Sequence, residues 1–237
     1  MKVIFILFLG IIFSSHAYCG IKNDCAQGNG QVSKETRDIP AFHSIESNGS
    51  FEIYLTQGTA TTFRIEAESN ILPLITAEVH EGTLVLDTKK CIDSSKGVKI
   101  YLSAATLKNI ILNGSGVIVT NSKFSLSTNL RLVINGSGNI TFNIAVPRVE
   151  SLINGAGNIS LDGEATEQNI SIIGSGSLMA YDIISKKVSL DIQGSGSIEV
   201  NATQRLEATI SGSGSVSYHG SPEVIKYVTG SGEIVQR

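Results

Sequence analysis

Hydrophobic and polar positions alternate along the second half of the chain around a short motif that recurs seven times. The residue two before each motif is aliphatic in every copy, and so is the residue four after its first glycine. Apolar residues at even offsets on both sides of a glycine pair are typical of strands that bury one face. Each copy is therefore predicted to form a strand, a tight corner and a second strand. The motif is Gly-Ser-Gly, once Gly-Ala-Gly, and its first glycines are Gly114, Gly136, Gly155, Gly174, Gly194, Gly212 and Gly230.

The near-constant step between motifs, 18 to 22 residues, predicts a solenoid. A unit this short cannot close a core alone, so like units are expected to stack in parallel, each covering the apolar face of its neighbour. Glycine in a strand region costs roughly 0.5–1 kcal/mol relative to alanine. We therefore expect each corner to need a positive φ, or a backbone approach that no Cβ would permit. Residues 107–237 are assigned to this repeat solenoid.

The chain before the repeats carries weaker signals of the same architecture. Ile45, Ile53 and Leu55 occupy motif offsets around Gly49, while Phe51 replaces the second glycine, which predicts a degenerate rung. No apolar period of 3.6 residues occurs in the mature chain, so no helix of useful length is predicted.

Two alternating segments, 76–79 and 83–87, flank Glu81-Gly82 and predict a β-hairpin. We assign residues 37–106 to an N-terminal β cap, a hairpin and meander that would cover the first rung. An uncovered rung would offer an open strand edge to aggregation.

The N-terminus has the features of a secretory signal peptide. Lys2 precedes an apolar run from Val3 to Phe13, and Ser15-His16-Ala17 is a small-x-small cleavage site, so residues 1–17 are predicted to be removed. The run is too short to span a bilayer. Lipid attachment at Cys19 is disfavoured because Tyr18 is bulky where lipoprotein signals have a small residue. Residues 18–36 are polar and are expected to form a loose arm.

Three cysteines, Cys19, Cys25 and Cys91, remain after cleavage, and export would place them in an oxidising compartment. An odd number leaves one thiol free or paired between molecules. A Cys25–Cys91 disulfide would tie the arm to the first folded half, and we favour it over Cys19–Cys25, which would close only a small loop. The chain contains no CxxC and no Cys/His cluster, so we expect no metal site.

Composition excludes several partners. The full chain has 18 basic and 21 acidic residues; removing Lys2 with the signal leaves 17 against 21, a formal charge of −4. This balance offers no electrostatic footprint for nucleic acid or an anionic membrane. With 41% hydrophobic residues and no second long apolar run, the mature chain can bury a sizeable core, and no transmembrane segment is predicted.

Three stretches together resemble a known bacterial family: KETRDIPAFHSIESNGSFEIYLTQG (34–58), LPLITAEVHEGTLVLDT (72–88) and the repeats of the type INGSGNI (134–140). They are similar to the "putative auto-transporter adhesin, head GIN domain" family over about residues 34–237. The resemblance implies an all-β, parallel β-helix fold on an exported protein, right-handed as parallel crossovers nearly always are. It implies no catalytic residues and no cofactor.

No catalytic pattern emerges from the residues themselves. The mature chain has only His43, His80 and His219, and none lies in a Ser-x-Gly elbow, an HExxH pattern or a Cys/His spacing. The acidic residues are scattered among the repeats. At the position five after the first glycine, for example, Glu199 is the one acidic residue among seven copies. Paired carboxylates, which glycoside hydrolysis needs, are not evident. Walker-type phosphate loops and calcium-binding β-rolls also fail to match the repeat.

The middle residues of the motif are expected to stack as a ladder. A regular row of hydroxyl groups could meet a repetitive ligand such as a glycan, but serine is also simply small enough for a tight corner, and we favour that interpretation. Asn113, Asn135 and Asn154 precede three corners and predict a stack of side-chain hydrogen bonds along the rod. The candidate ligand-facing residues are Ser115, Ser137, Ser175, Ser195, Ser213 and Ser231.

These features favour a non-enzymatic, exported adhesin-like or binding module in the periplasm or at the cell surface, with a glycan or an envelope protein as partner. The alternative is an envelope scaffold that self-associates through the end of the solenoid. A third, less favoured hypothesis is a polysaccharide-active enzyme on a β-helix.

Overall fold

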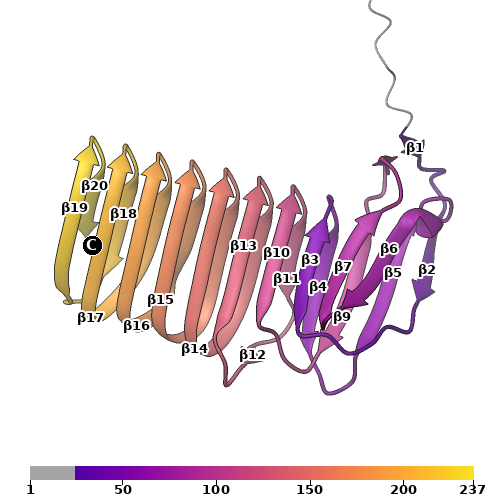
Figure 1. The fold of residues 1–237 in the computed structure, drawn as a ribbon, viewed down its shortest axis with the longest axis horizontal. Helices are drawn as coiled ribbons and strands as arrows, with labels where there is room; N and C mark the ends of the chain where they lie inside the picture. The colour runs from indigo at the N-terminus through magenta and orange to yellow at the C-terminus, as the bar shows by residue number, and fades with distance from the viewer. Residues whose placement is uncertain (1–24) are drawn as a thin grey trace, which may run out of the picture.

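The chain winds into a stack of flattened coils (Figure 1), described by a computed structural model over residues 25–237. The predicted signal peptide, residues 1–17, and Cys19 lie outside the described residues. The strands of the repeat region are β10 (Asn109–Gly114), β11 (Val117–Thr120), β12 (Phe124–Ser125), β13 (Leu130–Gly136), β14 (Asn139–Gly155), β15 (Asn158–Gly174), β16 (Ser177–Gly194), β17 (Ser197–Gly212), β18 (Ser215–His219), β19 (Glu223–Gly230) and β20 (Glu233–Gln236).

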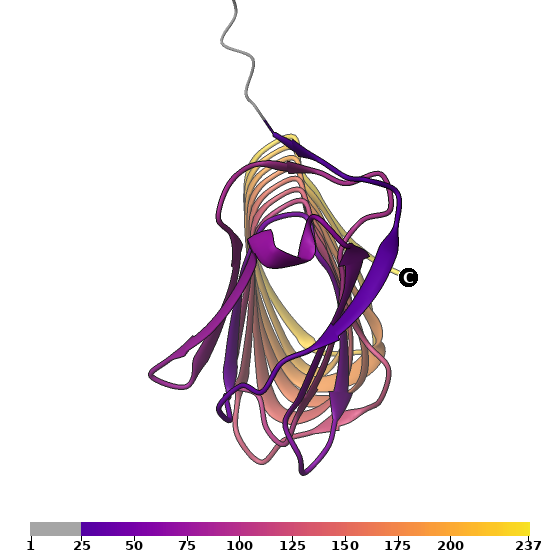
Figure 2. The ribbon, with the colours of Figure 1, turned by 90° about the vertical axis from the view of Figure 1, so that its right-hand side faces the viewer.

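Successive rungs pair in parallel and in register, as the repeat predicts. β14 and β15 pair from Asn139↔Asn158 to Gly155↔Gly174, so that motif glycines stand next to motif glycines. In Figure 1 the strands that rise to the glycine corner lie in front and the chain runs from right to left, so that in the view from the N-terminal end (Figure 2) it rises on the left and descends on the right as it recedes. The fold is therefore the predicted right-handed parallel β-solenoid. Its cross-section is a flattened oval whose narrow edge is the line of glycine corners.

The solenoid has two broad faces, separated by the glycine edge. The strands that end at a corner form the pre-corner face: β10, β13, the second halves of β14 to β17, and β19. The strands that follow a corner form the post-corner face: β11, the first halves of β14 to β17, β18 and β20. On both faces, alternate side chains point into the shared interior.

The core consists of the two aliphatic columns identified in the sequence. In the six copies from Gly114 to Gly212, no residue two before or four after the first glycine is more than 1% exposed. In the last copy, Val228 is 41% exposed because no further rung covers it within the described chain. Each interior position is thus buried by its neighbours on both sides, as stacking of short units requires.

Both physical reasons for the glycines operate at the corner. Gly136 has φ of +136°, a conformation that disfavours any Cβ. A Cβ built there would lie 2.5 Å from the carbonyl oxygen of Gly114 on the preceding rung. At the second motif glycine, Gly138, a Cβ would lie 2.6 Å from Cδ2 of Leu112. The corners are this close because the amide of Ser137 donates a hydrogen bond of 3.0 Å to the same Gly114 oxygen.

The N-terminal half continues the stack and then departs from the repeat. Its elements are β1 (Ala26–Gln27), β2 (Val32–Thr36), β3 (Ser44–Asn48), β4 (Glu52–Gln57), β5 (Thr62–Glu68), the 3-10 turn η1 (Leu72–Leu74), β6 (Ile75–His80), β7 (Thr83–Thr88), β8 (Ile92–Asp93) and β9 (Lys99–Ala104).

The predicted degenerate rung is present. β3 pairs in parallel with β10, and β4 pairs in parallel with β11, so Gly49 lies beside the corner at Gly114. Phe51, which replaces the second glycine, is buried. β7 and β9 add one further parallel layer outside this rung, against β3 and β4 respectively.

Antiparallel strands occur only at this end of the described chain. β6 and β7 form the predicted hairpin, which turns at Glu81 and Gly82 with positive φ at both residues. β5 pairs antiparallel with β9, and β2 pairs antiparallel with β5. Figure 2 shows η1 at the same end of the coil.

The expectation of a loose arm over residues 18–36 is wrong for its described part, residues 25–36. β2 belongs to the main sheet, and β1 pairs in parallel with β8. A disulfide joins Cys25 to Cys91, across 66 residues of sequence. The polar composition suggested a loose arm because it offers little apolar surface to bury. Hydrogen bonds and a disulfide hold these residues in place instead.

Glu68 is central to that attachment. It is fully buried, at 0% exposure. Its carboxylate accepts hydrogen bonds from the Ser94 hydroxyl (2.6 Å), the Gly30 amide (2.7 Å) and the Ser95 hydroxyl (3.2 Å). The hydrogen bond from Ser94, with those from Gly30 and Ser95, lowers the pKa of Glu68 even though burial opposes this shift. The carboxylate thereby ties the arm to the segment after β8.

Gly136→Ala should destabilise the protein by about 3 kcal/mol, because it combines a strained positive φ with a steric clash against a backbone oxygen that cannot rotate away. Chemical denaturation followed by circular dichroism measures this change. Ser137→Ala is the matched control: it is exposed, and Ala156 occupies the equivalent position one rung later. Equal stability of the two variants would contradict the steric account of the corner.

Candidate functional site

The middle motif residues form a ridge along the narrow edge of the solenoid. All seven are exposed, six serines and Ala156, so the six candidate serines are available to solvent. The ridge is held together by its backbone, since each middle-residue amide from Ser137 to Ser231 donates to the first motif glycine of the preceding rung. The hydroxyls of Ser50 and Ser115 lie 2.9 Å apart at its start.

The predicted asparagine stack lies directly beside this ridge, on the pre-corner face. Asn154 donates to Asn135 (2.8 Å), Asn135 donates to Asn113 (2.8 Å), and Asn113 donates to Asn48 (2.7 Å). The interpretation of these residues as a structural hydrogen-bonded ladder is confirmed. Their amide groups are used to hold the rungs in register.

A second ladder on the post-corner side was not anticipated. The side chain of Asn158 donates to Asn139 (2.8 Å), and the Ser177 hydroxyl donates to Asn158 (2.9 Å). These residues each lie three positions after the first motif glycine of their rung. They form a second hydrogen-bonded ladder just beyond the corner.

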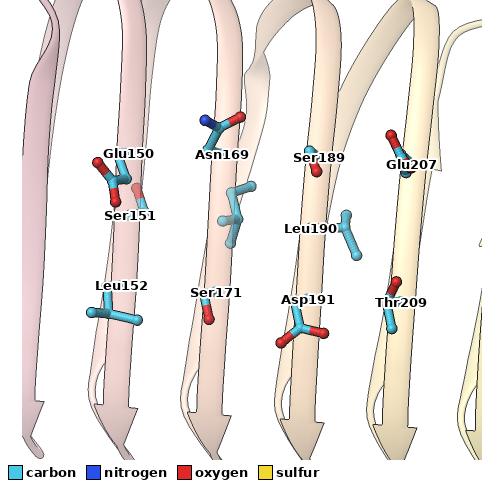
Figure 3. Close-up of a pocket in the computed structure, with 11 residues that line it drawn as sticks. Glu150, Ser151, Leu152, Asn169, Ser171, Ser189, Leu190, Asp191, Glu207 and Thr209 are labelled. Atoms are coloured by element: carbon cyan, nitrogen blue, oxygen red, sulfur yellow. The ribbon is translucent and has the colours of Figure 1, made fainter.

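A recess of the repeat region lies on the pre-corner face and is drawn in Figure 3. This repeat hollow has a volume of about 250 Å³ and crosses the second halves of β14, β15, β16 and β17. Two outward-facing lines of residues form it, in strand register: Glu150, Asn169, Ser189 and Glu207, and beside them Leu152, Ser171, Asp191 and Thr209.

Differences in side-chain size produce the repeat hollow. Ser171 and Ser189 stand on the two central rungs, whereas Glu150, Leu152 and Glu207 rise on the outer rungs. A flat sheet thereby acquires a shallow recess without any loop. The central rungs offer hydroxyl and amide groups and the carboxylate of Asp191, and the outer rungs add the carboxylates of Glu150 and Glu207.

Each carboxylate of the lining has a polar neighbour. Glu150 forms an ion pair with Arg131 (3.4 Å), and Glu207 forms one with Arg205 (3.6 Å). Asp191 accepts a hydrogen bond of 3.0 Å from the Gln193 side chain. These acids are therefore oriented by neighbours on the sheet and present hydrogen-bond acceptors to a ligand.

A charge ladder borders the repeat hollow on the side away from the glycine corner. It runs across the register positions Arg148, Glu167, Lys187, Arg205 and Glu223. Glu167 stands between two cations: Nε of Arg148 donates to it at 2.9 Å, and Nζ of Lys187 lies 3.9 Å away. The hydrogen bond and the charge of Arg148, helped by Lys187, lower the pKa of Glu167.

The described residues do not assemble a catalytic constellation. The three histidines lie apart: His43 contacts Ser44 (3.1 Å), His80 contacts Glu78 (3.0 Å), and His219 packs edge-on against Tyr181. Within residues 25–237, no three His, Cys, Asp or Glu side chains gather closely enough to hold a metal ion. That part of the chain also contains no helix with the length and apolarity needed to cross a membrane.

The repeat hollow and the charge ladder were both missed at the level of sequence. The residue seven positions before the first motif glycine is charged in every copy from Arg148 onward. Aligning the repeats at this position would therefore reveal the charge ladder. The hollow has no comparable signal, because it depends on side-chain size in two neighbouring outward columns across four rungs.

Comparison with known proteins identifies relatives of this architecture. The family described as "Putative auto-transporter adhesin, head GIN domain" matches residues 41–222, more than half of the chain. No curated protein matches the chain.

Several crystal structures of bacterial proteins share the fold. A putative adhesin from Bacteroides fragilis NCTC 9343 has 26% identity and a TM-score of 0.79, over 89% of this chain and 98% of that one. A putative lipid binding protein from Parabacteroides distasonis ATCC 8503 has 25% identity and a TM-score of 0.76, over the same shares. A putative adhesin from Parabacteroides merdae ATCC 43184, at 24% identity, has a TM-score of 0.71 over 90% of this chain and 99% of that one.

Glu167→Gln should lower stability at neutral pH but not in acid. Because the folded-state pKa of Glu167 lies below its usual value of 4.5, its stabilising contribution is present above that value and is lost as the pH falls through the folded pKa. Thermal unfolding of wild type and variant from pH 7 to pH 3 should show a difference that shrinks with acidity. Glu199→Gln, on the post-corner face, is the control. A difference that persists unchanged at pH 3 would contradict this account.

Proposed function

The chain belongs to the putative auto-transporter adhesin, head GIN domain family, and from this we propose that it is an exported, non-enzymatic, adhesin-like binding module. Its partner is a glycan or a protein of the cell envelope or of a surface. The location is the periplasm or the cell surface, in keeping with the predicted signal peptide.

The observation that carries the proposal is the repeat hollow on a rigid, regular sheet. Its position is set by four stacked rungs, so its polar groups need little ordering when a ligand binds. Hydroxyl, amide and carboxylate groups converge there, while the lining of the repeat hollow contains no histidine or lysine that could act as a base toward its serines. A recess with this lining supports recognition of a polar ligand.

The relatives support a binding role without specifying the ligand. Two of the similar crystal structures are described as putative adhesins and one as a putative lipid binding protein. The lining of the repeat hollow includes Glu150, Asp191 and Glu207, which favours a hydrogen-bonding ligand over an acyl chain. The serine ridge remains a second proposed contact surface, since a row of exposed hydroxyls at strand spacing could meet a repetitive ligand.

A binding screen of residues 18–237 tests this function, using a glycan array, purified lipopolysaccharide, peptidoglycan and phospholipid vesicles. Ser171→Arg combined with Ser189→Arg fills the repeat hollow and should weaken binding at least tenfold. A second variant obstructs the ridge by changing Ser137, Ser175 and Ser195 to Lys. Thr141→Lys, on the post-corner face, is the control. Circular dichroism verifies that each variant folds.

Loss of binding in the hollow variant alone would support recognition at the repeat hollow, and loss in the ridge variant alone would move it to the serines. Binding of wild type to none of the four probe classes would overturn the proposal of a glycan partner.

The last rung favours one alternative, a scaffold that self-associates. β19 and β20 pair with β17 and β18 on one side only within the described chain, and Tyr227, Val228 and Val235 are exposed there. Unpaired strand edges are templates for another chain. Lys226 opposes this role, because it occupies the inward column that Ala208 fills one rung earlier.

Self-association through this rung predicts a mass that rises with protein concentration. Sedimentation of wild type at increasing concentration, beside Tyr227→Lys combined with Val228→Lys, measures it. A doubled mass that the paired substitution abolishes would support the scaffold. A strict monomer at high concentration would exclude it.

A further inference from the structure

A second recess lies on the opposite, post-corner face near the N-terminal end of the solenoid. This tyrosine hollow has a volume of about 440 Å³ and lies between the ends of β4 and β9, the start of β5 and the loop at 58–61. Its lining includes Tyr54, Thr56, Thr62, Tyr101, Ser103 and Asn121, and none of its lining residues is charged.

Two tyrosines form one wall. Tyr54 and Tyr101 are register partners on β4 and β9, and their rings stack 5.1 Å apart at an angle of 15°. The Arg64 guanidinium covers the other side of Tyr101, with Cζ 4.3 Å from the ring centroid. The Tyr54 hydroxyl donates to the Glu52 carboxylate at 3.1 Å. Both faces of the Tyr101 ring are thus covered, by Tyr54 and by Arg64. The wall is a rigid stack that offers the edges of its rings to a ligand.

The opposite wall and the floor are held in place by hydrogen bonds. Gln57 acts as a clamp: its side-chain amide donates to the carbonyl oxygens of Ala105 (3.2 Å) and Ser125 (3.0 Å), and its oxygen accepts from the Ser125 amide (2.9 Å). The Asn121 amide donates to the Leu55 carbonyl at 2.7 Å. The Gly58 amide donates to Ala104 at 3.1 Å.

Gly58 lies at the border of the recess, against Ser103. A Cβ at this position would lie 2.5 Å from the Ser103 hydroxyl oxygen, so a larger residue would require this hydroxyl to rotate away. The hydrogen bonds of Gly58 and Gln57 hold the border of the hollow in place before any ligand arrives. A recess formed in advance binds without the entropy loss of ordering a loop.

We propose that the tyrosine hollow is a binding site for a neutral sugar unit of a glycan. The hydroxyls of Thr56, Thr62 and Ser103 and the amide of Asn121 can both donate and accept hydrogen bonds, which matches the hydroxyl groups of a sugar ring. Tyrosine presents an apolar body with a polar end, which suits the mixed surface of a sugar. The volume falls within the range of small-ligand sites, roughly 300–1,000 Å³.

The uncharged lining distinguishes this site from the repeat hollow and selects against charged ligands. Burying a carboxylate or an ammonium group in an uncharged recess leaves it without a counter-ion, which is unfavourable. Two charged residues outside the lining are engaged with the two tyrosines: Arg64 packs on Tyr101, and Glu52 accepts the hydrogen bond from Tyr54. The site stands on a different face and on different residues from the recess in Figure 3, so its existence does not depend on the proposed function of that recess.

Saturation-transfer NMR and isothermal titration on residues 18–237 test the proposal. The probes are neutral oligosaccharides of glucose, mannose, galactose and N-acetylglucosamine, with an oligogalacturonate as the charged comparison. Thr56 and Thr62 are exposed, so Thr56→Glu and Thr62→Glu should fold while adding a carboxylate to the recess. The matched control is Thr141→Glu, an exposed threonine on the same face but outside the lining.

We expect at least one neutral oligosaccharide to bind, with at least tenfold weaker binding in Thr56→Glu and Thr62→Glu and no change in Thr141→Glu. Binding that both lining variants retain would overturn the assignment of the site. Binding of none of the neutral probes, or of oligogalacturonate alone, would overturn the assignment of the ligand. The arginine variant of the repeat hollow should leave this binding intact, which separates the outcome from that of the proposed function.

Discussion

The fold depends on a column of glycines whose backbones touch. At each corner the amide of the middle residue reaches the carbonyl of the preceding corner, and at the second glycine the adjoining aliphatic side chain occupies the space where a Cβ would stand. The motif therefore needs glycine for two reasons: the positive φ at the corner, and the close contact between the backbones of neighbouring rungs. Because the contact involves backbone atoms on both sides, it cannot relax by a change of rotamer. One corner thus determines the register of the next, and the register is carried along the stack.

Fixed register turns the outer surface into a lattice of columns. Residues at one offset stand side by side at the strand spacing, about 4.8 Å. The asparagine ladders and the charge ladder are direct products of this geometry, since each side chain meets its equivalent from the next rung. Recesses arise from the same lattice where small residues occupy adjacent columns, as Ser171 and Ser189 do. A protein of this kind can present a binding surface on its strands, without the loops that carry most sites in other folds.

The two ends of the described solenoid differ in how they treat the exposed edge. The N-terminal end of the described chain carries antiparallel strands, η1, the Cys25–Cys91 disulfide and the buried Glu68 carboxylate. The tyrosine hollow belongs to this irregular end, where β5 and its preceding loop depart from the repeat. At the other end, β19 and β20 retain the repeat geometry, and Lys226 places a charge in an inward column. An inward-pointing charge on an edge strand is a recognised means of discouraging further pairing.

The sequence by itself determined the repeat architecture, because a seven-fold period with invariant aliphatic columns leaves a parallel stack as the way to bury them. It also determined the corner glycines, the rung at Gly49, the hairpin at Glu81-Gly82 and the asparagine ladder, since each follows from local conformation or from the period. Only the tertiary structure decided the attachment of residues 25–36, because Gly30, Glu68 and Ser94 are far apart in sequence and meet through non-local hydrogen bonds. The two recesses were likewise decided in three dimensions. Their shape depends on the relative size of side chains from four rungs, or from strands and a loop brought together by antiparallel pairing, and no period in one dimension records it.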